Sequence, residues 1–223
     1  MERTIEIRLN GVALPGTLGI PEHASALVLF AHGSGSSRRS PRNTAVARSL
    51  RKGGVATLLI DLLTEEEDAD YETRFDIELL ADRLSDIVGW LENETETRDL
   101  AIGLFGASTG AAAALRVAAR LGSRIAAVVS RGGRPDLAKE SLDRVVSPTL
   151  IIVGGDDDAV LPLNVSSYRA LRCEKELKII PGATHLFEEP GALEQVATLA
   201  LDWFRSHATK RGAAREPAAP GAR

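Results

Sequence analysis

The sequence has only one cysteine, Cys173, which excludes an intramolecular disulfide and any metal site built from several thiolates. Aromatic residues make up only 4% of the chain, which argues against an aromatic platform for carbohydrate or a deep aromatic pocket. There is no basic excess, since the formal charge is -4, and nucleic acid or an anionic membrane is therefore not expected as a partner. No apolar run approaches the roughly 20 residues of a membrane helix, and the N-terminus does not resemble a signal peptide. We therefore expect a cytoplasmic protein.

The length and composition are those of one globular domain. A chain of 223 residues suits a single α/β domain, and its 44% apolar and 26% charged residues are close to the averages for soluble proteins. From about residue 209 the composition shifts to Ala, Gly, Pro, Arg and Lys, which cannot bury enough apolar surface to order itself. We expect a domain over residues 1–208 and a flexible tail over residues 209–223.

The N-terminal pattern predicts an antiparallel hairpin, and the rest predicts a parallel sheet. Apolar and polar residues alternate over residues 4–9, Asn10-Gly11 is a tight-turn sequence, and residues 12–20 would form the returning strand. Short runs that are apolar on both faces follow, as expected of parallel strands covered by helices. These runs are Ala26–Ala31, Val55–Leu62, Leu100–Phe105, Ile125–Val129, Thr149–Val153 and Leu177–Ile180.

Helical patterns separate these runs. Ser40-Pro41 is typical of a helix start, apolar residues keep helical spacing from Ile77 to Leu91, and an alanine-rich segment runs from Thr109 to Leu121. A last apolar stripe runs from Leu193 to Phe204. Alternating strands and helices after a hairpin predict an α/β fold with a mostly parallel, doubly wound sheet of about eight strands.

The strongest chemical signal is the segment Gly106-Ala-Ser108-Thr-Gly110, which lies between a predicted strand and a predicted helix. A G-x-S-x-G motif in this context is typical of a sharp turn that exposes a nucleophilic serine. Glycines two residues before and after Ser108 remove side chains that would collide in the turn. The serine would also sit at a helix N-terminus, which favours a developing negative charge.

A nucleophilic serine needs a base, and the base needs an orienting acid. Of four histidines, only His185 both follows Ser108 and lies directly after a predicted strand. Three adjacent carboxylates, Asp156, Asp157 and Asp158, follow another strand between these two residues. They could instead suggest a cation site, but EF-hand spacing and further ligands are absent, so no metal is expected.

Four segments together resemble the dienelactone-hydrolase-like branch of the α/β-hydrolase superfamily. They are His32-Gly-Ser-Gly, Gly106-Ala-Ser108-Thr-Gly110, Gly154-Gly-Asp-Asp157 and Ala183-Thr-His185. The resemblance runs from about residue 4 to residue 207 and implies an α/β-hydrolase fold with triad order Ser, Asp, His. True dienelactone hydrolases carry a cysteine nucleophile, whereas this chain has a serine.

The resemblance implies roles for individual residues. Ser108, Asp157 and His185 would form the catalytic triad, with Asp157 chosen by the family pattern Gly-x-x-Asp followed by a valine; Asp156 and Asp158 remain alternatives. Backbone N–H groups of Ser34 and Thr109 would bind the oxyanion. The implied function is hydrolysis of small acyl esters through an acyl-enzyme, without a cofactor.

Several weaker expectations concern the substrate. Arg131 directly follows a strand, so it could bind an anionic substrate group, and His32 is a second candidate substrate-binding residue. Only one helix fits between residues 129 and 149, which predicts that no cap domain covers the site and that the cleft is shallow. Cys173 is expected to be a packing residue in a helix.

Other functions remain open. A thioesterase, a lactonase or an acyltransferase would use the same triad. The chain could also be a binding or regulatory module with little turnover, because a fold does not fix a function. The partner in every enzymatic case is a small acyl molecule.

Overall fold

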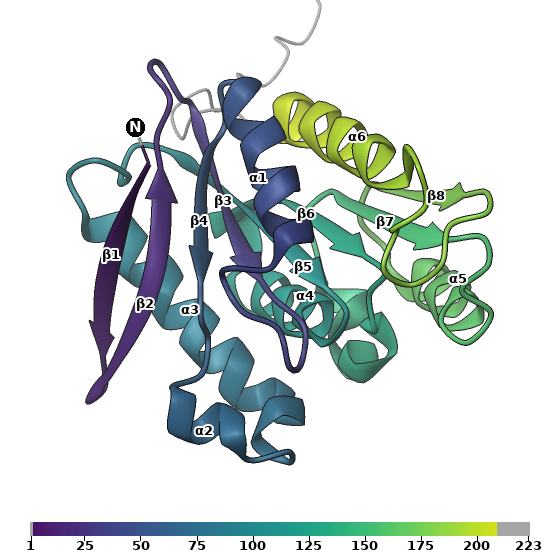
Figure 1. The fold of residues 1–223 in the computed structure, drawn as a ribbon, viewed down its shortest axis with the longest axis horizontal. Helices are drawn as coiled ribbons and strands as arrows, with labels where there is room; N and C mark the ends of the chain where they lie inside the picture. The colour runs from purple at the N-terminus through teal and green to yellow at the C-terminus, as the bar shows by residue number, and fades with distance from the viewer. Residues whose placement is uncertain (1, 209–223) are drawn as a thin grey trace, which may run out of the picture.

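The protein forms one eight-stranded sheet in the order β1-β2-β4-β3-β5-β6-β7-β8 (Figure 1). The computed structural model describes residues 2–208. The strands are β1 (Glu2–Leu9), β2 (Val12–Gly19), β3 (Ala26–Ala31), β4 (Ala56–Ile60), β5 (Ala101–Ala107), β6 (Ile125–Arg131), β7 (Thr149–Gly154) and β8 (Lys175–Ile180). All pairings from β4 to β8 are parallel, whereas β1 pairs antiparallel with β2 and β2 antiparallel with β4.

The N-terminal hairpin follows from its turn sequence. Asn10 and Gly11 both take positive φ, 45° and 87°, as a two-residue turn requires. Leu9 then pairs with Val12, and every other residue of β1 has a partner in β2. The predicted hairpin is confirmed.

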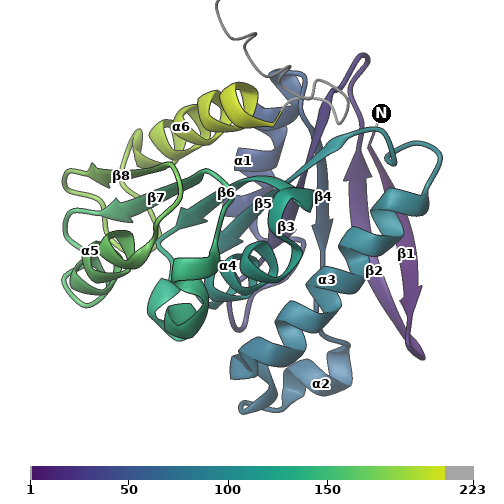
Figure 2. The same cartoon turned by 180° about the vertical axis from the view of Figure 1, so that it is seen from behind.

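Helices cover both faces of the sheet. They are α1 (Pro41–Lys52), α2 (Glu65–Ala69), α3 (Ile77–Asn93), α4 (Thr109–Leu121), α5 (Leu161–Ala170) and α6 (Ala192–His207), with short 3-10 segments at Thr73–Phe75, Gly122–Arg124 and Pro135–Arg144. Figure 1 shows α1 and α6 together on one face, and Figure 2 shows α3 and α4 together on the other. Each face therefore has its own apolar core, one beneath α1 and α6 and one beneath α3 and α4.

The sequence signals for the helices correspond to their ends. The Ser40 side chain caps α1 by accepting from the Asn43 N–H, and Pro41 is the first helical residue. At the end of α4, Gly122 takes a φ of 57°, which favours glycine. The predicted α/β-hydrolase fold, with its doubly wound sheet and without a cap domain, is confirmed. The segment between β6 and β7 holds only the 3-10 segment Pro135–Arg144.

Two predictions need comment. Cys173 was expected in a helix, and this is wrong, because α5 ends at Ala170 and Cys173 lies in the loop before β8. Its side chain still packs against the core, and burial raises the pKa of the thiol, which disfavours a reactive thiolate. The predicted flexible tail, residues 209–223, lies outside the described residues. None of the helices within residues 2–208 has the length and apolar character needed to cross a membrane.

Candidate active site

A small cavity lies where the loops after several parallel strands meet. Its volume is about 210 Å³, and it brings together residues from four separate loops. Four of the residues predicted for the site line it: Ser34, Ser108, Arg131 and His185. The other lining residues are Gly33, Ser36, Ser40, Arg42, Asn43, Ala107, Gly132 and Leu186. Carboxyl ends of parallel strands are where open α/β sheets bind ligands, so this cavity is the candidate active site.

Ser108 lies at the sharp turn between β5 and α4. Its backbone has φ 51° and ψ -124°, a conformation that a residue with a side chain rarely adopts. Backbone strain of this kind is typical of a nucleophile elbow. The Ser108 carbonyl accepts hydrogen bonds from the N–H groups of Ala111 and Arg134, which hold the turn between the helix and the loop after β6.

The two glycines of the motif are required by close backbone approach. A Cβ at Gly106 would lie 2.4 Å from the Ala111 Cα, and one at Gly110 would lie 2.2 Å from the Ala31 carbonyl oxygen. Helix α4 therefore approaches β3 and β5 more closely than alanine would allow. This approach fixes Ser108 relative to the loop after β3.

We expect Gly110→Ala to destabilise the protein by about 3 kcal/mol, because backbone atoms on both sides of the new methyl group must move. Gly89→Ala in α3 is the matched control, because nothing lies within 4 Å of its Cβ position. That substitution should stabilise the protein by about 0.5–1 kcal/mol through helix propensity. Urea unfolding of both variants measures the difference. Equal midpoints for the two variants would contradict the close packing of α4.

His185 is oriented by a buried carboxylate. Its Nδ1 lies 2.8 Å from Asp157 Oδ2, and Asp157 is only 7% exposed. The neighbouring Asp156 and Asp158 are exposed. In the neutral imidazole, an Nδ1–H donated to Asp157 leaves Nε2 as the proton acceptor. Of the three adjacent aspartates, Asp157 is therefore the one placed to orient His185.

The two predicted oxyanion residues contact one another. The Ser34 N–H donates to Thr109 Oγ1 at 2.8 Å, and the Thr109 side chain is buried. The Ser34 N–H would have to be shared or released from this bond to stabilise an oxyanion. The Thr109 hydroxyl thus holds the loop after β3 against the first turn of α4.

Arg131 is buried in the wall of the cavity. It is 6% exposed and donates from Nη2 to Asn43 Oδ1 at 3.2 Å, while its guanidinium lies 5.7 Å from the centre of the Phe187 ring. Burial and the nearby Arg42 charge lower the pKa of Arg131 to about 10. Asn43 was not predicted as a site residue, although it is a polar residue on the buried face of α1.

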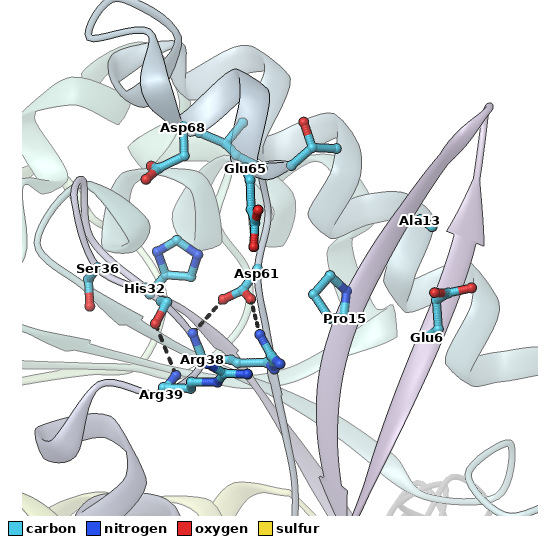
Figure 3. A pocket seen from close by; sticks show the side chains of 13 residues that line it. Glu6, Ala13, Pro15, His32, Ser36, Arg38, Arg39, Asp61, Glu65 and Asp68 are labelled. Atoms are coloured by element: carbon cyan, nitrogen blue, oxygen red, sulfur yellow. Dashed lines mark hydrogen bonds and ion pairs between the residues drawn. The ribbon is translucent and has the colours of Figure 1, made fainter.

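His32 lies beside a second cavity of about 590 Å³, shown in Figure 3. Its Nε2 accepts from the Leu62 N–H at 3.3 Å, and its Nδ1 lies 3.0 Å from the Gly33 carbonyl oxygen. Both ring nitrogens of His32 therefore contact backbone atoms. This arrangement favours a role for His32 in holding the loop after β3 in position. Nearby, the Arg38 N–H donates to Asp61 Oδ1 at 2.6 Å.

Within residues 2–208, no three His, Cys, Asp or Glu side chains gather as metal ligands.

A family model agrees with the fold and covers most of the chain. The model, described as an alpha/beta hydrolase domain, matches residues 24–204. A crystal structure of a dienelactone hydrolase from Anabaena variabilis is 52% identical, with a TM-score of 0.91, over 93% of this chain and 98% of that one. The fold also resembles that of Est1E from Butyrivibrio proteoclasticus, with a TM-score of 0.79 at 18% identity over 91% of this chain and 98% of that one.

Longer relatives carry a different name. Two Mycobacterium tuberculosis proteins named "Putative phosphoribosyl transferase" are 54% identical over 92% of this chain. The chain spans only 46% of their length, so that name describes proteins about twice as long as the matched segment.

Proposed function

The chain belongs to the α/β-hydrolase family, and we propose that it hydrolyses small acyl esters through an acyl-enzyme formed on Ser108. The observation that carries the proposal is the buried Asp157 carboxylate 2.8 Å from His185 Nδ1, with His185 and Ser108 lining one cavity. A serine at a strained strand-to-helix turn, beside an oriented histidine, is the arrangement that nucleophilic acyl transfer needs.

In the proposed mechanism, His185 takes the proton of Ser108 as its Oγ attacks the acyl carbonyl. The new C–O bond forms while the carbonyl electrons move onto oxygen, and His185 then gives its proton to the leaving alcohol. Water, deprotonated by His185, then attacks the acyl-enzyme; the bond between the acyl carbon and Ser108 Oγ breaks, His185 returns the proton to Oγ, and the acid leaves. Asp157 stabilises the imidazolium that forms in each step.

The oxyanion needs two donors at the N-terminus of α4 and the loop after β3. The Thr109 N–H belongs to the first helical residue, whose N–H has no partner within the helix. The Ser34 N–H is the second donor once it is shared with the substrate oxygen. Donors of this kind are typically each worth about a hundredfold or more in rate.

A lactonase is the second candidate, because a dienelactone hydrolase is 52% identical over nearly the whole chain. A lactone is a cyclic ester, and the same residues would open it. Thioesterase and acyltransferase activities would also use this triad, the latter with an alcohol in place of water. The transferase name of the longer relatives does not identify any residue of this chain that would carry out a transfer.

The test is turnover of p-nitrophenyl acetate and p-nitrophenyl butyrate by the purified full chain. We expect release of p-nitrophenol well above the uncatalysed rate, and loss of that rate after incubation with a fluorophosphonate. Release of acid from γ-butyrolactone, followed with a pH indicator, tests the lactonase. A folded protein that turns over neither ester nor lactone would refute the proposal.

A further inference from the structure

The wall of the Ser108 cavity contains a buried cation without a carboxylate partner. Arg131 has Nη2 bound to Asn43, but its Nε is buried and has no hydrogen-bond partner among the described residues. No carboxylate within residues 2–208 forms an ion pair with it. Buried arginines are ordinarily paired, because an isolated charge in a protein interior is costly.

The charge of Arg42 repels the Arg131 guanidinium. Arg42 also lines the cavity, and its charge lowers the pKa of Arg131 in addition to burial. Arg42 is paired at 2.9 Å with Glu188, but Glu188 is an exposed residue outside the cavity lining. No acidic side chain of the described chain lines the cavity, so its wall carries two guanidinium groups and no carboxylate.

Arg131 is also close to the nucleophile in the sheet. In the β5–β6 pairing it lies opposite Ala107, the residue before Ser108, and its carbonyl accepts the Ser108 N–H at 3.3 Å. A cavity of about 210 Å³ has room for only a small molecule. A group bound by Arg131 would therefore belong to the same molecule that Ser108 attacks.

We propose that Arg131 and Arg42 form an anion subsite, so that the preferred substrate is a small acyl compound carrying a carboxylate or a phosphate. The guanidinium fork matches both groups, and the hydrogen bond from Arg131 Nη2 to Asn43 Oδ1 holds Arg131 in the cavity wall. This inference rests on the proposed ester hydrolysis, and it adds the charge that the substrate carries.

The first experiment compares two esters of similar size. These are p-nitrophenyl hemisuccinate, which carries a carboxylate, and p-nitrophenyl valerate, which is neutral. We expect wild type to favour the charged ester in kcat/KM by about tenfold to a hundredfold, the range of a charge-assisted hydrogen bond. Arg131→Gln should abolish that preference mainly by lowering kcat/KM for the charged ester, and Arg131→Lys should restore part of it. The matched control is Arg39→Gln, which changes an exposed arginine in the loop between β3 and α1 that does not line the Ser108 cavity.

A second experiment needs no turnover. Isothermal titration of the wild type with succinate and with inorganic phosphate separates the two anion sources, and Arg42→Gln should weaken whichever anion binds. Binding of an anion without ester turnover would contradict the proposed hydrolysis and leave the subsite standing. Ester turnover with equal preference for both esters, and no binding of either anion, would overturn the subsite and leave the hydrolysis standing. If Arg131→Gln does not fold, the wild-type preference, the titrations and Arg42→Gln decide the question.

Discussion

Ser108→Ala should lower kcat for p-nitrophenyl butyrate by about a millionfold, to the residual rate that binding alone provides. The substitution removes the Oγ that forms the acyl-enzyme, and no other group at the elbow can replace it. Cys173 cannot substitute, because its side chain packs against the core and its pKa is raised by burial. The measurement is p-nitrophenol release in parallel with thermal unfolding.

The control for this variant is Ser206→Ala, which removes an exposed hydroxyl from α6. It should retain the wild-type rate. Ser108→Ala should unfold at about the wild-type temperature, because the Ser108 side chain makes no capping hydrogen bond to α4 that the substitution would remove. A rate for Ser108→Ala within tenfold of the wild-type rate would show that Ser108 is not the nucleophile.

Asp157→Asn should lower kcat by about ten-thousandfold. The amide is nearly isosteric with the carboxylate, but it can donate a hydrogen bond to His185 Nδ1 and so favour the tautomer that cannot accept the Ser108 proton. It also removes the negative charge that stabilises the imidazolium. Steady-state kinetics with p-nitrophenyl acetate measures the effect.

The adjacent residues supply matched controls for Asp157. Asp156→Asn and Asp158→Asn remove the same charge from exposed positions, and among the described residues neither side chain forms a hydrogen bond or an ion pair with His185. Each should change kcat less than twofold. If Asp156→Asn or Asp158→Asn lowered kcat as much as Asp157→Asn, catalysis would depend on the negative charge of this loop and not on the hydrogen bond to His185.

Much of the fold was predictable because its signals are local. The parallel strands are apolar on both faces, and the run Ala26–Ala31 corresponds to β3 without change. Strand ends were less accurate: β5 continues to Ala107 because the chain stays paired with β6 up to the elbow. Cys173 was misplaced because α5 ends at Ala170 and the next residue, Leu171, takes an extended conformation that the sequence pattern did not indicate.

The site residues that could be predicted are those that directly follow a strand, because the topology of the sheet then fixes their position. Ser108 and His185 follow strands, so their meeting at one edge of the sheet follows from the topology. The sequence does not show which of the three adjacent aspartates orients His185, because the conformation of the loop decides which one is buried. The Asn43–Arg131 bond joins residues 88 positions apart and depends on where the first turn of α1 lies relative to the end of β6, which no local pattern encodes.

The most direct test of the central claim is covalent labelling of the wild type and Ser108→Ala with a fluorophosphonate, followed by peptide mass spectrometry. The proposed triad predicts one adduct per chain, mapped to Ser108, which is absent from the variant and reduced in Asp157→Asn. No adduct on a folded wild type, or an adduct on another serine that persists in Ser108→Ala, would contradict the assignment of Ser108 as the nucleophile.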